Sequence, residues 1–354
     1  MPDPPTSPHA ITACLLAWYD QSRRVLPWRA GPNETPDPYR VWLSEIMLQQ
    51  TTVAAVEPYF RVFIARWPTL ADLAQADLND VLTAWAGLGY YARVHSLHKC
   101  AQAIAVTGTF PTDEKALRRL PGIGAYTAAA IAAIAFGRRA VAVDGNIERV
   151  ITRLCAVTEP LPTARPRIHT LADALMPESR CGDFIQAAMD LGAMLCTPRQ
   201  PVCMLCPLQP VCAAHRQGLA GSLPARANKS PRPIRQGLAF VAVRKDGAIF
   251  LRRRPQKGLL GGMMEIPSTP WRPESWMLKE AVSLAAPLSL FWQLLPGMVR
   301  HVFTHFQLDL KVAIAHAGPD PAAHGIWIAP EQMGEQALPS VMRKVLAHAL
   351  RYGY

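Results

Sequence analysis

The chain has 354 residues, half of them apolar, and a formal net charge of +11 at pH 7. This length and composition allow two or three domains with a sizeable core and exclude an intrinsically disordered protein. The basic balance favours a polyanionic partner such as nucleic acid, although solubility alone can also explain it. No signal peptide pattern is present, and the longest apolar run, Tyr126 to Phe136, is too short to span a bilayer. We therefore expect a cytoplasmic protein without membrane association.

Apolar residues recur at helical spacing from about residue 10 to residue 218. The helices predicted there cover 41–64 with a kink or junction at Pro58, 71–85, 97–106, 125–136, 147–157 and 167–175. The segment 221–235 is rich in Pro, Arg, Lys and Ser, which is typical of a linker. The later patterns predict strands over 238–243, 248–251 and 302–314 and helices over 276–285 and 341–351. We predict an all-α region over 1–220, a linker over 221–235 and an α/β domain over 236–354.

A glycine-containing turn joins two of the predicted helices, within about 115–136. In Leu120-Pro121-Gly122-Ile123-Gly124, the two glycines permit positive φ, and their amides lie at the start of the next helix. Such amides can hold a phosphate without reading any base. Taken alone, the motif also fits an ordinary helix–helix turn. Shortly afterwards, Asp144 in Val-Asp-Gly-Asn-Ile precedes another helix, where a plain N-cap is the simpler interpretation.

Four cysteines form a compact motif, C-x6-C-x2-C-x5-C, over residues 196–212. They are Cys196, Cys203, Cys206 and Cys212. Four thiolates at such spacing can hold an iron–sulfur cluster or a tetrahedral zinc ion. Scattered core thiols are disfavoured by the clustering among prolines, and two disulfides are disfavoured by the missing secretory signal. The spacing therefore predicts an inorganic centre and leaves its identity open.

In this order, the glycine hairpin, Val-Asp-Gly-Asn and the four cysteines resemble the helix-hairpin-helix DNA glycosylases that carry a [4Fe-4S] cluster. Within that superfamily, Leu26–Arg29, Val41–Thr52 and Gly87–Arg93 resemble the adenine DNA glycosylase family. The resemblance implies a [4Fe-4S] cluster at the cysteines. It also implies a monomeric repair enzyme that binds double-stranded DNA and removes adenine mispaired with 8-oxoguanine or guanine.

Two carboxylates account for the chemistry that the resemblance implies. Cleavage of an N-glycosidic bond needs an acid for the departing purine and an anion beside the oxocarbenium-like sugar. Glu45 lies in an apolar helical stretch, so burial should raise its pKa and keep a proton available. Asp144 precedes a helix whose first amides favour the ionised form, so the two environments should push the two pKa values apart, up for Glu45 and down for Asp144. By resemblance, Glu45 protonates adenine and Asp144 supports the cation.

Further positions carry over from the family by resemblance. Tyr126 stands where bifunctional relatives have a Schiff-base lysine, so we expect base removal without strand cleavage. A base inside a duplex must be flipped out, and Gln50 and Tyr90 occupy the family's wedging positions, with Leu88 on the same loop as Tyr90. The remaining DNA or base contacts are expected at Trp28, Arg29, Gly122, Gly124, Asn146 and Gln186. Tyr90 and Tyr91 fit a core role equally well, and among the pocket positions Trp28 is the one that best fits packing alone.

The C-terminal region resembles the Nudix-like domain of adenine glycosylases through Phe250–Arg254 and Gly258–Pro267. It lacks the Arg-Glu-x-x-Glu-Glu array that holds magnesium in a Nudix hydrolase, so we expect a recognition domain. In the family, a Phe-Ser-His loop senses 8-oxoguanine. Here Thr304 replaces that serine beside His305. Basic residues dominate 224–257, where Asp246 is the one acid, which favours a phosphate track over a merely solvated linker.

Two other functions compete with this interpretation. A pyrimidine-lesion glycosylase with lyase activity is disfavoured by Tyr126 and by the Nudix-like domain. A catalytically silent DNA-binding protein with a cluster is disfavoured by the presence of both Glu45 and Asp144. The products that the protein forms from a duplex carrying adenine opposite 8-oxoguanine would distinguish these three functions.

Overall fold

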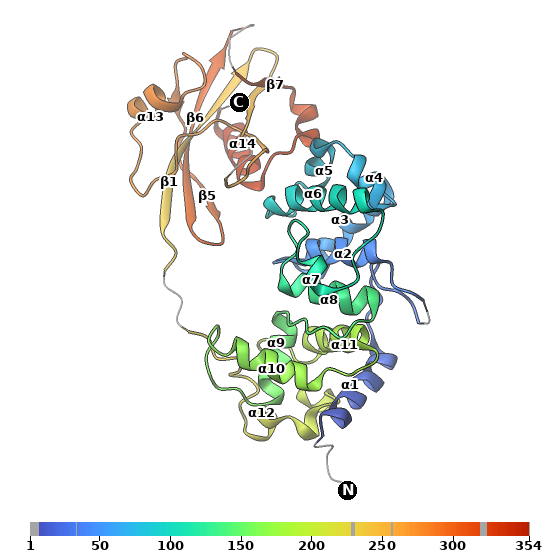
Figure 1. Cartoon of the computed structure of the whole chain (residues 1–354). Coiled ribbons are helices and arrows are strands. Elements are labelled where there is room, and N and C mark those ends of the chain that lie inside the picture. Colours follow the sequence, from blue (N-terminus) through green and yellow to red (C-terminus); the bar gives the residue numbers. More distant parts are fainter. Residues whose placement is uncertain (1–6, 33, 228–230, 256–257, 319–323, 354) are drawn as a thin grey trace. The chain divides into compact units, whose positions relative to one another are not determined.

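The computed structural model describes residues 7–32, 34–227, 231–255, 258–318 and 324–353 (Figure 1). The predicted linker 221–235 therefore lies partly outside the described residues. The chain forms two compact units, one made of Met1–Gln75 and Ser96–Lys229 and the other of Ala76–His95 and Ser230–Tyr354. Among the described helices, none is long and apolar enough to cross a membrane.

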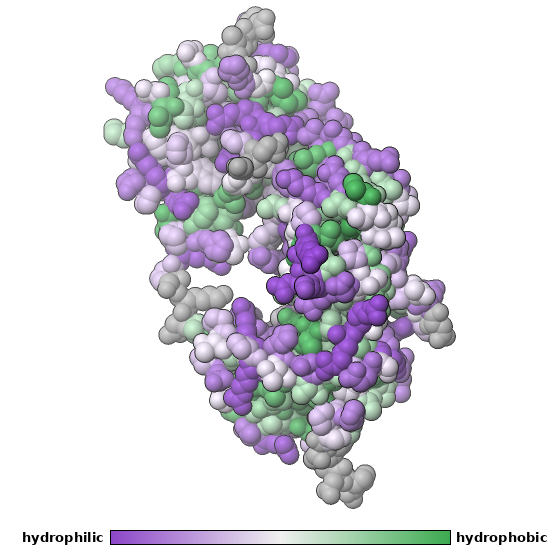
Figure 2. Space-filling view, viewed as in Figure 1, coloured by the Kyte–Doolittle hydropathy of each residue, from purple (hydrophilic) through white to green (hydrophobic). Residues whose placement is uncertain are grey.

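The first unit is helical, as its periodicity predicted. Its helices are α1 (Pro8–Ser22), α2 (Pro38–Leu48), α3 (Val53–Arg66), α4 (Leu70–Gln75), most of α6 (Ala92–Thr107), α7 (Glu114–Leu117), α8 (Ala125–Phe136), α9 (Gly145–Leu154), α10 (Arg165–Leu175), α11 (Cys181–Met194) and α12 (Ala213–Arg216). Two 3₁₀ turns, η1 (Cys203–Leu205) and η2 (Gln209–Val211), lie in the cysteine segment. Figure 2 shows hydrophilic residues over much of the visible surface, whereas α2 and α8 are largely buried.

Close packing of α11 brings its side chains to the centre of this unit. A Cβ at Gly182 would lie 2.7 Å from the Ala133 carbonyl oxygen of α8, and one at Gly192 would lie 2.7 Å from Asn146 Cβ of α9. Only glycine permits these approaches, because a side chain would have to push the neighbouring helix away. Helix α8 is itself rich in alanine and packs against both α2 and α11. These contacts place α2, α8, α9 and α11 around one space.

Two segments predicted as single helices each form two helices, and a capping residue precedes the second helix of each pair. The helix expected over 41–64 ends at Leu48 and restarts at Val53, while Pro58 lies inside α3. The Thr52 hydroxyl caps α3 by accepting a hydrogen bond from the Ala55 amide at 3.3 Å. The helix expected over 71–85 is likewise two helices, because Asp77 caps the second, α5 (Leu78–Trp85).

The second unit has one mixed sheet. Its strands are β1 (Ile234–Arg244), β2 (Ile249–Arg253), β3 (Met264–Glu265), β4 (Gln293–Leu294), β5 (Val299–Val302), β6 (Gln307–Ala317) and β7 (Ile326–Ile328). The order is β3-β2-β1-β6-β4, with β5 also paired to β6 and β7 to β2. Strands β1 and β6 run parallel over their full length, from Ile234 opposite Gln307 to Arg244 opposite Ala317. The strand expected over 302–314 is therefore the end of one strand, a turn and most of another.

The two faces of this sheet carry separate cores. Alternate residues of β1 point to opposite faces, as in any strand. Ala239 and Val241 join the core that contains Val345 of α14 (Ser340–Gly353), whereas Phe240 joins the core that contains Ala281 of α13 (Leu278–Ala285). A 3₁₀ turn, η3 (Pro330–Glu335), precedes α14. This arrangement confirms the predicted α/β domain.

The segment 76–95, which the sequence places in the helical region, is grouped with the second unit. Three hydrogen bonds join it to C-terminal residues. Thr83 Oγ1 donates to Glu335 O at 3.2 Å, Tyr90 and Thr304 pair through their hydroxyls at 3.2 Å, and His95 Nε2 lies 3.0 Å from Gly261 O. Such contacts join residues far apart in the chain, so local sequence patterns give no sign of them.

Candidate active site

A pocket of about 970 Å³ opens in the first unit, where α2, α8, α9 and α11 meet the loop after α1. Its walls include many of the residues to which the sequence assigned a role. These are Trp28, Arg29, Glu45, Gln50, Tyr126, Asp144, Asn146 and Gln186. They come from five separate segments, and the fold brings them to one space.

Glu45 is the buried acid of this pocket. It lies on α2 and is 7% exposed, and burial raises the pKa of its carboxyl to about 7. The Tyr126 hydroxyl donates a hydrogen bond that acts against this rise, the negative charge of Asp144 adds to it, and Arg29 acts against it. The raised pKa expected from an apolar helix is therefore confirmed. A carboxyl of this kind still carries a proton near neutral pH.

Asp144 is the N-cap of α9. Its Oδ1 accepts hydrogen bonds from the amides of Asn146 at 3.0 Å and Ile147 at 2.7 Å, and its Oδ2 accepts one from Asn146 Nδ2 at 2.9 Å. Burial nevertheless raises the pKa of Asp144 above its ordinary value, against these three bonds. The helix amides do favour the anion, as the sequence predicted, but desolvation outweighs them, so the predicted net lowering of the Asp144 pKa is wrong. The three hydrogen bonds act in favour of the anion.

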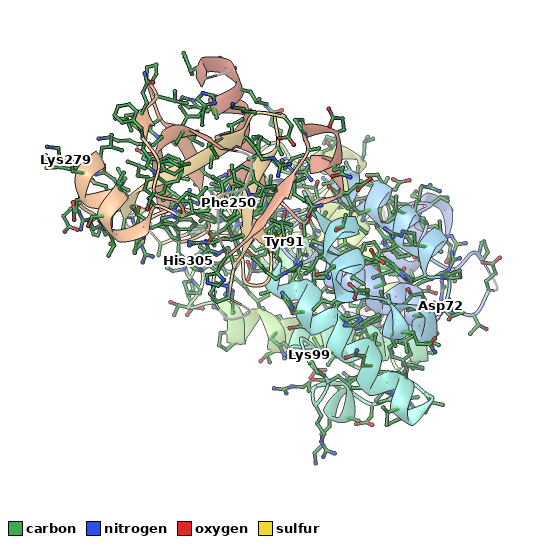
Figure 3. The ribbon with its side chains drawn as sticks, turned by 90° about the horizontal axis from the view of Figure 1, so that it is seen from above. Asp72, Tyr91, Lys99, Phe250, Lys279 and His305 are labelled. Carbon is green, nitrogen blue, oxygen red and sulfur yellow. The ribbon has the colours of Figure 1, made fainter. Side chains whose placement is uncertain are left out.

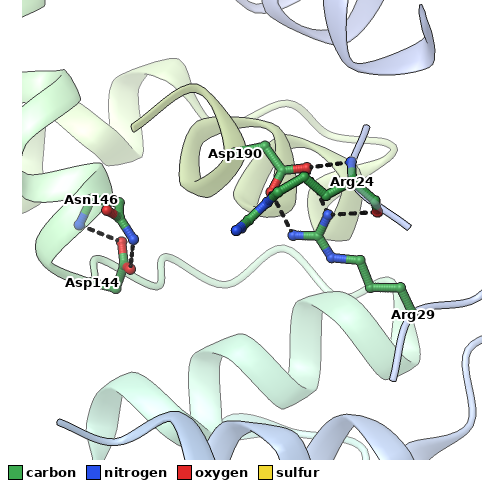
Figure 4. A network of polar contacts seen from close by, with 5 residues as sticks. All are labelled: Arg24, Arg29, Asp144, Asn146 and Asp190. Atoms are coloured by element: carbon green, nitrogen blue, oxygen red, sulfur yellow. Dashed lines mark hydrogen bonds and ion pairs between the residues drawn. The ribbon is translucent and has the colours of Figure 1, made fainter. Parts of the chain in front are cut away.

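Two arginines of the loop after α1 meet a buried carboxylate that the sequence analysis missed. Asp190 of α11 accepts hydrogen bonds from Arg24 and Arg29, and both arginines line the pocket (Figure 4). One signal was available, because Asp190 stands alone in an otherwise apolar helical stretch and a buried charge needs a partner. The identity of that partner, more than 160 residues away, had no such signal.

Arg149 of α9 links Asn146 to the cysteine segment. Its Nη2 donates to Asn146 Oδ1 at 2.9 Å, and its Nε donates to the Cys196 carbonyl at 2.6 Å. Because Asn146 also donates to Asp144, a continuous chain of hydrogen bonds runs from the pocket to Cys196. Sequence reasoning missed Arg149 as well.

The four cysteines of the motif line one small cavity, together with Arg153, Gln209 and His215. Arg153 is 2% exposed and donates to three carbonyls and, at 3.3 Å, to Cys196 Sγ. Among the described contacts, no carboxylate pairs with this cation. A buried guanidinium requires a counter-charge, and thiolates bound to an inorganic centre provide one. The described residues contain no group of three or more His, Cys, Asp or Glu side chains arranged for a single metal ion.

The hairpin glycines lie outside the pocket. Gly122 has φ +77°, and a Cβ there would lie 2.6 Å from Ser96 Cβ, so this position requires glycine. Gly124 is the N-cap of α8 and has no side chain to cap it. Both glycines are exposed, so their amides are available to an external ligand such as a phosphate.

The remaining predicted contacts belong to the second unit. Leu88 is buried, whereas Tyr90 is 43% exposed with φ +52°, and its hydroxyl pairs with Thr304. His305 is exposed at the turn between β5 and β6 (Figure 3). The alternative of a core aromatic fits Tyr91, which is 5% exposed, better than Tyr90. In the first unit, Trp28 both lines the pocket and packs edge-on against Phe60.

Comparison with known proteins identifies the family. Residues 43–174 match the model of the HhH-GPD superfamily of base excision DNA repair proteins, and residues 238–348 match the NUDIX domain. The chain is 35% identical to the human adenine DNA glycosylase over 95% of its own length and 73% of that protein. The chain belongs to the adenine DNA glycosylase family.

Other similar proteins agree with this membership. An adenine DNA glycosylase of Mycolicibacterium smegmatis is 43% identical over 55% of the chain and 66% of that protein. One from Buchnera aphidicola is 28% identical over 96% of the chain and 98% of that protein. The solved structure of a thermostable thymine-DNA glycosylase matches with a TM-score of 0.52 and 30% identity, over 58% of the chain and 95% of that structure. Membership in the adenine DNA glycosylase family confirms the resemblance seen in the motifs.

Proposed function

We propose that this chain is a cytoplasmic, monomeric, monofunctional adenine DNA glycosylase of base excision repair, acting on adenine opposite 8-oxoguanine or guanine. One observation carries the proposal: a buried carboxyl with a pKa of about 7 shares a pocket with a second, hydrogen-bonded carboxyl. Acid and anion are the two groups that cleavage of an N-glycosidic bond requires.

In the proposed reaction, Glu45 donates its proton to the flipped adenine, which then leaves as a neutral base. The C–N bond breaks with its electron pair on the base, and the sugar becomes an oxocarbenium-like cation. Asp144 stabilises this cation as an anion held by two backbone amides. Water then adds to the sugar cation, its proton passes to the Glu45 carboxylate, and an abasic site results.

Tyr126 supports the monofunctional assignment. Its hydroxyl hydrogen-bonds to Glu45, and burial raises its pKa well above the ordinary value. It therefore stays a neutral donor and is no nucleophile toward the sugar. A lyase would need an amine for a Schiff base, and no lysine is among the residues that line the pocket.

The DNA partner is proposed from three features. The exposed amides of Gly122 and Gly124 suit a phosphate, Gln50 adopts φ +57° in the loop between α2 and α3, and Tyr90 is exposed beside Thr304. In the first unit, we expect Gln50 to fill the space left by the flipped base. In the second unit, we expect the exposed Tyr90 to contact the duplex. Thr304 and His305 are proposed to contact the 8-oxoguanine, with the threonine hydroxyl in place of the family serine.

The cysteine motif fits a [4Fe-4S] cluster held by Cys196, Cys203, Cys206 and Cys212. Four thiols line one cavity, and the guanidinium of Arg153 beside Cys196 supplies positive charge for an anionic centre. When bound, the cluster provides a rigid structural centre and no hydrolytic chemistry. The protein's own contribution is to hold the loop and to neutralise its charge.

We expect the purified protein to contain iron and inorganic sulfide at a ratio near one, with little zinc. Cys203→Ala should lose most of both, because one thiolate ligand is missing. Cys100→Ala is the matched control, since Cys100 is buried elsewhere in the same unit. Elemental and sulfide analysis provides the measurement. Stoichiometric zinc without sulfide would show that the alternative centre is correct.

The function itself is tested with a duplex that carries adenine opposite 8-oxoguanine. We expect strand breaks only after treatment with alkali, because base removal leaves an intact, alkali-labile strand. Breaks without alkali would indicate a lyase, and no breaks under either condition would indicate a non-catalytic DNA-binding protein. Duplexes with A:G and with T:A pairs measure the preference for the mispair.

A further inference from the structure

We propose that Asp190 is a positioning residue for this reaction. It holds Arg24 and Arg29 in the pocket wall, and its negative charge offsets cationic charge that would otherwise favour the deprotonated form of Glu45. The inference rests on the proposed function, in which Glu45 is the acid. Asp190 itself does not line the pocket, so it acts through the arginines.

The geometry around Asp190 is specific. Its side chain is fully buried on α11, and it accepts four hydrogen bonds (Figure 4). Arg29 donates through Nη1 to Oδ2 at 2.6 Å and through Nη2 to Oδ1 at 2.9 Å. Arg24 donates through Nε to Oδ1 at 2.5 Å and through its backbone amide to Oδ2 at 3.0 Å. One carboxylate thus binds one arginine in a bidentate manner and ties down a second.

Arg29 depends on this partner. Its side chain is 9% exposed, and the one other described hydrogen bond of its guanidinium goes to the Arg24 carbonyl at 3.3 Å. A nearly buried guanidinium without an anion is strongly disfavoured. Burial acts to raise the pKa of Asp190, but the hydrogen bonds and charge of Arg29 hold it below its ordinary value, so Asp190 stays ionised. The carboxylate therefore neutralises the cation and does not compete with Glu45 for protons.

The groups that face Glu45 define what the charge of Asp190 does. Tyr126 from α8 donates a hydrogen bond to the carboxylate and favours it, Asp144 before α9 opposes it, and Arg29 from the loop favours it. The cations that also line the pocket are Arg24, Arg149 and Arg226. Burial is the largest effect and sets the pKa of Glu45 at about 7 with Asp190 ionised.

Removal of the Asp190 charge should shift the pKa of Glu45 in one direction. Without this anion, the positive charge of Arg29 is uncompensated, and a nearby cation favours the ionised carboxylate. The pKa of Glu45 should then fall, so that the acid loses its proton at a lower pH. Excision depends on the protonated acid. The alkaline limb of the pH–rate profile, where the excision rate falls as the pH rises, should therefore move to lower pH. When the pH is above the pKa of Glu45, each decrease of one unit in that pKa should lower the excision rate about tenfold.

The test is Asp190→Asn in the full-length protein, with single-turnover excision measured from about pH 5.5 to about pH 9. We expect the alkaline limb to move down by about one pH unit, with a rate loss of about tenfold at high pH and a smaller loss at low pH. Asp183→Asn is the matched control. It removes one carboxylate from the same helix, but that carboxylate pairs with Arg180. A rate loss that is equal at every pH, or an unchanged profile, would overturn the proposal.

Two further measurements separate charge from folding. Asp190→Asn combined with Arg29→Gln removes anion and cation together, and the alkaline limb should return toward its wild-type position even though the maximal rate is lower. Carbon-13 NMR of the free protein, labelled at glutamate Cδ and assigned with Glu45→Gln, reports the titration of Glu45 without any substrate. An unchanged Glu45 titration in Asp190→Asn contradicts the inference, whereas a wild-type protein that excises no adenine contradicts the proposed function.

Discussion

Replacement of Glu45 by glutamine is expected to lower single-turnover adenine excision by about 10² to 10⁴-fold, the usual contribution of a positioned general acid. Glutamine keeps the shape of the side chain and has no acidic proton for the purine. Binding of the duplex should change little, because phosphate contacts supply most of the affinity for DNA. Excision is measured with a labelled duplex, and binding is measured by fluorescence anisotropy.

Glu57→Gln is the matched control for this variant. Glu57 lies on the neighbouring helix α3 and forms an i,i+4 pair with Arg61 in which both side chains are exposed. The same change of charge there should leave excision within about twofold, since exposed pairs contribute little. Near-normal excision by Glu45→Gln would remove Glu45 from the mechanism, and equal losses in both variants would mean that overall charge is responsible.

The same substitution is expected to make the protein more stable above neutral pH. The pKa of Glu45 rises from 4.5 to about 7 on folding, so between these values the native protein binds more protons than the unfolded chain. The free energy of unfolding therefore falls as the pH rises through this window, by up to about 3 kcal/mol. Glutamine has no such cost, so Glu45→Gln should melt higher than wild type at pH 8 and similarly at pH 4.5. Equal melting temperatures at both pH values would contradict the raised pKa.

Local signals made part of this structure predictable. Helix α8 was expected over 125–136 and occupies Ala125–Phe136, because alanines favour helix and Gly137 provides a left-handed C-cap at φ +63°. The burial of Glu45 followed from its apolar neighbours along the helix. The N-cap role of Asp144 followed from its place before a helical pattern. In each case the deciding interactions lie within a few residues of the chain.

Features that depend on tertiary packing were not predictable. The direction of the Asp144 pKa was wrong because it depends on which helices cover that carboxyl, whereas the amides that favour the anion are local. The pairing of Asp190 with two arginines joins α11 to a loop far away in sequence. The turn at residues 303–306 that separates β5 from β6 was read as continuous strand, since its apolar residues Phe303 and Phe306 pack together.

Replacement of Asp144 by asparagine is expected to lower the rate of excision by about 10² to 10³-fold while the fold is kept. Asparagine is as good an N-cap as aspartate, so the bonds to the Asn146 and Ile147 amides persist and stability changes by less than about 1 kcal/mol. The loss comes from the anion beside the developing sugar cation, a contribution comparable to that of one preorganised electrostatic group. Single-turnover rates and thermal melting provide the two measurements.

Charge and capping at Asp144 are separated by a second N-cap aspartate. Asp113 caps α7 by accepting from the Ala116 amide at 2.9 Å and is exposed, so Asp113→Asn should alter neither rate nor stability. Asp144→Asn has one further consequence, because the negative charge of Asp144 helps to raise the pKa of Glu45. Its removal should move the alkaline limb of excision to lower pH, in addition to the loss that is common to all pH values. A variant whose loss disappears at low pH would show that Asp144 acts through Glu45 alone and that the sugar cation needs no anion from it.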